Sequence, residues 1–471
     1  MIRPLLKKCR FVMAVLVSAV FLQNCSTMDF DLPEDSLEIK TQNDAGQQEH
    51  AEMLRVFGGE YKDTRIRNML ENIVRRIVPA TSHPGQYYKV TILNSQIVNA
   101  FALPSGRLYV TRGLLALAND SSEIAAVMAH EIAHVTLRHA AARTEMEARS
   151  ALVTKVVADV LQDKSESARY SDRSRFSIAR FSREQEFEAD DVGISTLTKA
   201  GYDPYGATRF LKSLERWNGG VRSNMDMLST HPSLKERIQK TLHSARRIGA
   251  PGIGDQGRSA YLEAIDGLAF GDSPREGLVK GRRFIHTDMH FMFEAPPGFR
   301  LENSSHAVLG SNDAAGQRLL LDVVKAKDSL ENILGTIWNE DIQPEDYQPV
   351  TVNGLTAVTA KATNGEWHFR IAAIQIGNNV FRLIIASRKD GSTLEAAFQQ
   401  ILHSVKSPTQ QDQEGFQSWK IHIVKASERD SSTSLAQKMP AHLGLEKFLV
   451  LNGLSVGEAV KAGEHYKIII E

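Results

Sequence analysis

The amino-acid sequence predicts an α+β protein of several domains, on three observations. The chain has 471 residues, of which 42% are hydrophobic and 24% charged, as in soluble globular proteins. At ~150 residues per domain, this length allows about three domains. Apolar residues recur at helical spacing up to residue 250, whereas alternating, β-rich patterns dominate after it. We therefore expect a mainly helical first domain with a small β-sheet, then an α+β domain and a small third module.

Positive and negative charges are balanced over the chain. Lys and Arg total 56, Asp and Glu total 56, and the formal net charge at pH 7 is zero. A neutral chain has no long-range field that would collect nucleic acid or anionic lipid. We therefore expect no nucleic-acid partner.

The N-terminus has the pattern of a secretory signal. Basic residues within the first ten precede a 12-residue apolar run at 11–22, which is shorter than the ~20 residues that a membrane span needs. Residues 22–26 resemble a bacterial lipobox, although Asn24 replaces the usual small residue. We expect export to the periplasm and membrane contact only through a lipid on Cys25, with Ser26 favouring the outer membrane. The alternative is ordinary signal cleavage, with Cys25 incidental.

The first domain begins after a polar stretch. Residues 25–49 are rich in acidic and amide side chains, which predicts a flexible tether. A helical pattern follows, with Leu70, Ile73 and Ile77 on one face. Residues 88–93 alternate and are β-branched, and residues 99–111 have the pattern of two strands joined at a turn, so we expect an antiparallel hairpin.

Further helices are expected in this domain, the last of them after Pro232 with Leu234, Ile238 and Leu242. Asp120, followed three residues later by Glu123, has the form of a capping box and opens a helix whose apolar stripe runs over 124–132. A second helix is expected over 183–200, ended by the glycine that follows it. Asp203 and Pro204 then begin a third.

A new domain is expected after the glycine-rich stretch 251–257. Asn353-Gly354 and Asn364-Gly365 indicate two hairpins, and Ser392 opens a helix. A polar linker then precedes a short final unit. The predicted organisation is a signal peptide, a tether, the first domain, a linker, an α+β domain, a second linker and a final module, over residues 1–24, 25–49, 50–250, 251–283, 284–407, 408–416 and 417–471.

The helix opened by Asp120 carries the candidate chemistry, in the sequence His130-Glu131-Ile-Ala-His134. Spacing by four residues places both imidazoles on one face, where they can bind one zinc ion, and Glu131 can reach a water beside it as a general base. Such a motif also occurs by chance. However, two histidines and a glutamate would be costly to bury in an otherwise apolar helix unless a metal satisfied them.

A third ligand is expected from the helix over 183–200. Glu186 and Asp190 share one face of it, so Glu186 can coordinate the metal while Asp190 accepts the outer N–H of a ligating histidine. Glu184 and Glu188 compete for the ligand role. His139 is out of register for a third histidine, and we interpret it as a surface or supporting residue.

These motifs together resemble a known peptidase family. The HExxH motif, Glu186-x-x-Ala-Asp190, Gly201-Tyr-Asp-Pro204 and Ser229-Thr-His231-Pro are similar to the gluzincin peptidases of the HtpX, BepA and CAAX prenyl endopeptidase family over residues 50–245. The resemblance implies a zincin protease domain with Glu186 on zinc and Asp190 in support. It also implies that the strand beginning at Asn99 can pair with an extended substrate. Because no 20-residue apolar run follows the signal, the exported BepA-like branch fits best.

The resemblance leaves two roles open for His231. In BepA-like enzymes a histidine in the His-Pro segment can take the fourth zinc position and block catalysis. Alternatively, His231 donates a hydrogen bond to the tetrahedral oxyanion, with Arg237 reaching the same pocket. We favour the blocking ligand.

The C-terminal units have weaker resemblances. Residues 284–407 are faintly similar to PsbP-like α+β folds, and we assign them no chemistry. Residues 417–471 resemble a degenerate LysM module, the kind that binds glycan in the cell wall. Only part of the usual turn remains at Asp430, so the module is either a peptidoglycan-binding unit or a structural cap.

We expect a zinc metalloendopeptidase that hydrolyses misfolded or misassembled proteins of the bacterial cell envelope. Its partners would be protein or peptide substrates and its cofactor one Zn2+ per chain. The alternative is a chaperone-like assembly or cell-wall-binding factor in which proteolysis is latent or secondary.

Overall fold

The computed structural model describes residues 35–139, 181–217, 227–272, 276–303, 307–335, 343–389, 391–414, 416, 418–441 and 443–471. The chain divides into two compact units, Met1–Ala51 and Glu52–Glu471. The predicted signal peptide and Cys25 lie outside the described residues. In the described part of the chain, no helix combines the length and apolar character that crossing a membrane requires.

Part of the predicted tether is helical. Helix α2 runs over Asp35–Val56, so the expectation of a flexible segment over 25–49 is wrong from Asp35 onwards. Its residues are mostly helix formers, with one glycine, Gly46, and no proline. A polar composition is common to coils and to solvated helices, so composition alone could not separate the two.

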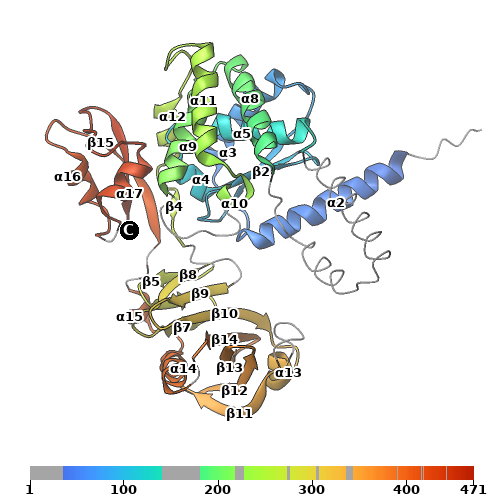
Figure 1. Ribbon diagram of the computed structural model, residues 1–471, viewed down its shortest axis with the longest axis vertical. Helices are drawn as coiled ribbons and strands as arrows, with labels where there is room; N and C mark the ends of the chain where they lie inside the picture. Colours follow the sequence, from blue (N-terminus) through green and yellow to red (C-terminus); the bar gives the residue numbers. More distant parts are fainter. Residues whose placement is uncertain are drawn as a thin grey trace, which may run out of the picture. The chain divides into compact units, whose positions relative to one another are not determined.

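The first domain packs helices around a three-stranded sheet (Figure 1). Its helices are α3 (Thr64–Ile77), α4 (Arg112–Leu117), α5 (Ser121–Thr136), α8 (Arg183–Lys199), α9 (Gly206–Trp217), α10 (Met227–Thr230), α11 (Leu234–Ile248) and α12 (Arg258–Ile265). The strands are β1 (Lys89–Leu93), β2 (Ala100–Leu103) and β3 (Arg107–Thr111), in the order β1-β3-β2. β2 and β3 pair antiparallel, so the predicted hairpin is confirmed. β1 and β2 are the two edge strands of this sheet.

Helix α5 lies in the middle of this domain. Its N-cap, Asp120, accepts from the Glu123 backbone N–H as predicted, but the Glu123 carboxylate accepts from Asn119 instead of closing the capping box. The helix is buried from Ser121 to His134. Close packing on α8 depends on Gly193, where a Cβ would lie 3.3 Å from the His130 backbone nitrogen. The two helices therefore face each other at the position of the HExxH motif.

The middle domain is built on a seven-stranded antiparallel sheet of order β11-β12-β13-β14-β10-β9-β8 (Figure 1). Its elements are β5 (Leu278–Lys280), β6 (Arg283–His286), β7 (Phe291–Glu294), β8 (Arg300–Asn303), β9 (Ala307–Asn312), β10 (Gln317–Lys325), α13 (Leu330–Gly335), β11 (Glu345–Val352), β12 (Leu355–Asn364), β13 (Trp367–Ile376), β14 (Asn379–Ser387), α14 (Ser392–Ser404) and α15 (Gln410–Gln413). Both predicted hairpins form, at Asn353-Gly354 and at Gly365. Helices α14 and α13 pack on opposite faces, because alternate residues of β13 belong to two different cores.

The C-terminal module has the order β15 (Trp419–Lys425), α16 (Ser432–Ala436), α17 (Gly444–Leu451) and β16 (His465–Ile470). It shares one hydrophobic core with the first domain, including Ile421, Phe448 and Ile469. The fully buried Lys467 donates from Nζ to the carbonyls of Ala116, Leu117 and Ala118 at 2.7–3.2 Å. These carbonyls end α4, so Lys467 caps that helix.

The described residues of the predicted linker over 251–283 include folded structure. It contains α12, whose Tyr261, Leu262 and Ile265 lie in the core of the first domain, and β4 (Ala269–Phe270), which pairs with β15. The glycines before residue 258 are typical of a linker, whereas the helical spacing of these three apolar residues is the signal of the helix.

Candidate metal centre

Two histidines of α5 approach each other in the interior. The Nε2 atoms of His130 and His134 are 3.0 Å apart, and both side chains are buried together with that of Glu131. Two imidazole nitrogens this close can share a proton in a hydrogen bond or can bind one metal ion. The ring of Phe181 stacks on His134 with 3.9 Å between centroids, a contact that no pattern in the sequence indicated.

Helix α8 brings one of its acids to the two histidines. Glu186 is fully buried, and its carboxylate oxygens lie 3.5 Å from the Nε2 atoms of His130 and His134. The side chains of Glu184 and Glu188 are 74% and 58% exposed. Of the three acids that competed in the sequence, the fold thus places Glu186 against the histidine pair.

His231 completes the group from the turn between α10 and α11. Its Nδ1 lies 2.9 Å from Glu186 Oε1 and 3.4 Å from His130 Nε2. The turn is held by the backbone N–H of Met227, which donates to the carbonyl of Val98 beside β2. His130, His134, Glu186 and His231 each offer one donor atom, and all four atoms lie within 4.8 Å of one another.

The outer side of the cluster is tied by ion pairs. Asp190 Oδ1 lies 2.9 Å from His130 Nδ1. Arg237 donates to both oxygens of Asp190 at 2.7 and 2.8 Å, and its Nη1 lies 2.6 Å from Glu186. In the structure the donors of Arg237 are directed at these two carboxylates, and a role of Arg237 towards an oxyanion stays a prediction.

Burial and neighbouring charges move the pKa values of the two imidazoles apart. Burial and the Arg237 charge lower the pKa of His130, but the carboxylates of Asp190 and Glu186 together outweigh both and raise it to about 9. Burial, followed by the charge of His130, lowers the pKa of His134. His130 Nδ1 is thus held by a carboxylate, while the nitrogen that faces the cluster must be free of a proton to bind a metal.

The pKa values of the carboxylates of Glu131 and Glu186 are shifted in opposite directions. Burial raises the pKa of Glu131, which moves this base towards neutral pH, where a general base works best. Burial would raise the pKa of Glu186 as well, but the charges of His231 and Arg237 reverse the effect and lower it. Glu186 is therefore held ionised, as a metal ligand must be.

A tetrahedral zinc ion fits this donor set. Ligand atoms at ~2.1 Å from such an ion lie about 3.4 Å apart. Five pairings of these side chains have distances of 2.9–3.5 Å, counting either oxygen of Glu186, and one set of four donor atoms lies within 4.8 Å of one another. One buried oxygen, Glu131 Oε1, has no hydrogen-bond partner among the described residues. A water beside a bound ion would satisfy it.

The fold and the site define a metallopeptidase domain: a buried helix with HExxH, a second helix with the acid, and an edge strand beside them. Residues 64–245 match the peptidase family M48. This part of the chain is therefore an M48 metalloendopeptidase domain.

Individual proteins show the same likeness. The mitochondrial metalloendopeptidase OMA1 of Arabidopsis thaliana is 37% identical over 160 residues, covering 34% of this chain and 32% of that protein. The beta-barrel assembly-enhancing protease of Escherichia coli is 28% identical over 226 residues, covering 46% of each. The chain spans 32% of the length of the first relative and 46% of the length of the second.

A solved structure has a weak likeness to part of the chain. The cyanobacterial PsbP of Synechocystis is 14% identical, covering 28% of this chain and 94% of that one, with a TM-score of 0.23. A likeness this weak carries no argument about what that part does.

Proposed function

We propose that the protein is a zinc-dependent endopeptidase of the bacterial cell envelope that cleaves misfolded or misassembled proteins. The observation that carries this proposal is the buried set of His130, His134 and Glu186 with Glu131 next to it. Zinc, when bound, supplies a Lewis acid that polarises a carbonyl and acidifies water. Glu131 is then placed to take the proton of the attacking water and to deliver it to the leaving amine. The protein named as an assembly-enhancing protease supports the choice of substrate class.

An extended substrate would lie along β2. This strand pairs with β3 on one side and is one of the two edge strands of its sheet, so its other side offers backbone donors and acceptors to a peptide. Phe101, Ala102 and Leu103 of β2 are partly exposed. Since β2 packs beside α5, a peptide bound in this way would pass the HExxH motif.

In this proposal His231 acts as a blocking fourth ligand. Catalytic zinc sites keep one position open for water, whereas sites with four protein ligands are closed. The 2.9 Å between His231 Nδ1 and Glu186 supports a closed site. Activation then requires the turn after α10 to move away from the metal.

Metal analysis combined with a hydrolysis assay tests the proposal. The mature chain is expected to bind one zinc per molecule and to hydrolyse casein slowly, and a chelator should abolish the reaction. If the protein holds no zinc, or holds zinc yet hydrolyses nothing even after His231→Ala, the assignment as an endopeptidase is wrong. The second result would favour a binding or chaperone role.

For location, we propose the periplasm with a lipid anchor on Cys25, on the strength of the lipobox-like sequence. A Cys25→Ser variant should move from the membrane fraction to the soluble fraction, since a single lipid would be the anchor. If the variant stays on the membrane, another contact holds it.

For the C-terminal module we propose the structural role over glycan binding. The core that it shares with the first domain and the cap that Lys467 places on α4 support this choice. In a sedimentation assay with purified peptidoglycan, substitutions in the 427–431 turn should leave the behaviour of the full chain unchanged. Binding that these substitutions abolish would favour glycan recognition by the module instead.

A further inference from the structure

The two ligand histidines of α5 have different partners on their outer nitrogens. His130 Nδ1 faces a carboxylate, that of Asp190. His134 Nδ1 faces another imidazole, with 2.9 Å to Nδ1 of His139. His139 is 4% exposed, so it is an interior residue and has no place on the surface.

A hydrogen-bonded chain continues outwards from His139. Its Nε2 lies 3.3 Å from Glu188 Oε2 on α8, and its backbone carbonyl accepts from the side chain of Gln185 at 3.2 Å. Helix α8 thus holds the ring and the backbone of His139 at once. Glu188, which was a rival for the ligand position in the sequence, contacts the support of a ligand instead.

The carboxylate of Glu188 decides which nitrogens donate and which accept in this series of hydrogen bonds. A neutral imidazole has one N–H, and Glu188 accepts it from His139 Nε2, which leaves His139 Nδ1 as an acceptor. His134 must then donate from its own Nδ1. The proton is therefore absent from His134 Nε2, the nitrogen that faces Glu186 and His130. The opposite order would put a proton on that nitrogen and a lone pair against the Glu188 carboxylate.

The backbone departs from helical geometry to make this contact. Helix α5 ends at Thr136, and in a continued helix residue 139 would lie about 140° around the axis from His134. Arg138 instead adopts φ +56°, a left-handed conformation that side chains other than glycine rarely take. The turn that it makes returns His139 to the outer face of His134.

We propose that His139 is a positioning residue for the metal centre, which fixes the tautomer and orientation of His134 with Glu188 as its acceptor. This inference rests on the proposed zinc site. Outer partners of ligating histidines usually matter by 10–100-fold in metal affinity. Loss of His139 should therefore weaken zinc binding by about that factor while Glu131 remains in place.

The test measures the zinc dissociation constant by competition with a chromophoric chelator. His139→Leu removes the acceptor and should weaken binding about 10–100-fold. His139→Asn puts an oxygen near the former Nδ1 and should keep most of the affinity, whereas His139→Gln puts it near the former Nε2 and should not. His243→Leu, at an exposed histidine of α11, is the matched control and should bind zinc like the unmodified chain.

The outcomes separate the two proposals. If the unmodified chain binds no zinc, the proposed site itself is wrong. If it binds zinc and His139→Leu binds equally well, the role of His139 is overturned. Should His139→Leu fail to fold, the Asn and Gln variants decide, because equal affinities for those two would contradict an acceptor at Nδ1. In the cobalt-substituted protein, the visible spectrum should change with His139→Gln and stay similar with His139→Asn.

Discussion

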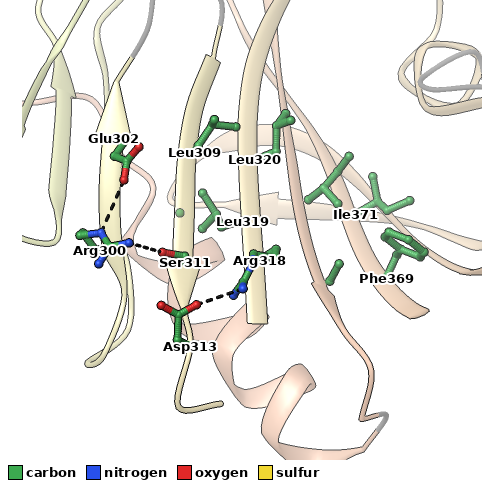
Figure 2. Close-up of a pocket in the computed structure, with 13 residues that line it drawn as sticks. Arg300, Glu302, Leu309, Ser311, Asp313, Arg318, Leu319, Leu320, Phe369 and Ile371 are labelled. Carbon is green, nitrogen blue, oxygen red and sulfur yellow. Dashed lines mark hydrogen bonds and ion pairs between the residues drawn. The ribbon is translucent and has the colours of Figure 1, made fainter. Parts of the chain in front are cut away.

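The metal centre between α5 and α8 and the pocket on the seven-stranded sheet differ in what fills them. Figure 2 shows the pocket, with Leu309, Leu320, Ile371 and Phe369 on strands of the middle domain. It has a volume of about 520 Å³, the size of a small-ligand site. The metal centre, in contrast, is packed with ionisable groups that face one another. Volume alone would point to the wrong region for the chemistry.

The charges of the two regions explain the difference. At one end of the pocket, Arg300 pairs with Glu302 at 3.5 Å and Arg318 with Asp313 at 3.0 Å (Figure 2). Exposed pairs of this kind contribute little to stability, and their charges are already matched. A buried cluster of carboxylates and imidazoles is costly to desolvate and is weak evidence for a stabilising role. The cluster is therefore the region whose existence calls for a ligand.

The largest expected loss of hydrolysis comes from substituting Glu131. This substitution also tests whether the chemistry belongs to the metal centre. A Glu131→Gln chain should bind zinc normally and lose hydrolysis by about 10²–10⁴-fold, since the amide cannot take a proton. Zinc content and casein turnover of the same preparation measure both quantities. Turnover that persists in a fully metallated Glu131→Gln sample would refute the role of Glu131.

Substitution of His231 is expected to change hydrolysis in the opposite direction to substitution of Glu131. If its Nδ1 blocks the fourth position, His231→Ala should raise hydrolysis while the other three ligands keep the zinc. A transition-state donor would instead lose about 10²-fold in turnover when removed. The sign of the change, measured at full zinc occupancy, distinguishes a blocked centre from an open one.

Residue spacing accounts for much of the metal centre. His130 and His134 follow from a helix period alone, and the same period separates Glu186 from its neighbours two residues away. The partners of Arg237 and the position of His139 do not follow from spacing. The first depends on how α11 packs against α8, and the second on the left-handed turn at Arg138. Local patterns predict which side chains share a face, whereas contacts across elements need the tertiary structure.

Lys467 is expected to hold the C-terminal module against the first domain. Lys467→Ala leaves the three carbonyls at the end of α4 without their donor and opens a cavity in a shared core, so we expect a loss of about 3 kcal/mol or more. Thermal unfolding should show the loss, and Lys461→Ala, at an exposed lysine of the same module, should not. An equal, small effect of the two variants would mean that the module is only loosely attached.

The stability of the protein is expected to depend on pH through Glu276, which lies between the two regions in the sequence. Burial raises the pKa of Glu276 to about 7, although Arg112 opposes the rise. An acid whose pKa is raised on folding binds its proton more tightly in the native state, so stability is highest below pH ~4.5 and falls as pH rises towards 7. The loss is up to about 3 kcal/mol for this group. Glu276→Gln should flatten the curve of unfolding free energy against pH over that range, and an unchanged curve would exclude Glu276 as the source.

The smallest effect on stability and hydrolysis is expected from a substitution in the pocket. It tests whether the pocket acts separately from the metal centre. Leu309 is 47% exposed on β9, so Leu309→Asp removes little buried surface and should cost no more than about 0.5 kcal/mol. Because the pocket lies on the middle domain and its own charges are paired, we expect zinc content and peptide hydrolysis to match those of the unmodified chain. Ile371→Asp, at a fully buried position of the same face, should unfold the domain and serves as the positive control for damage. A Leu309→Asp chain that melts normally yet hydrolyses protein substrates poorly, while still cleaving short peptides, would contradict this separation and make the pocket a substrate-binding surface of the peptidase.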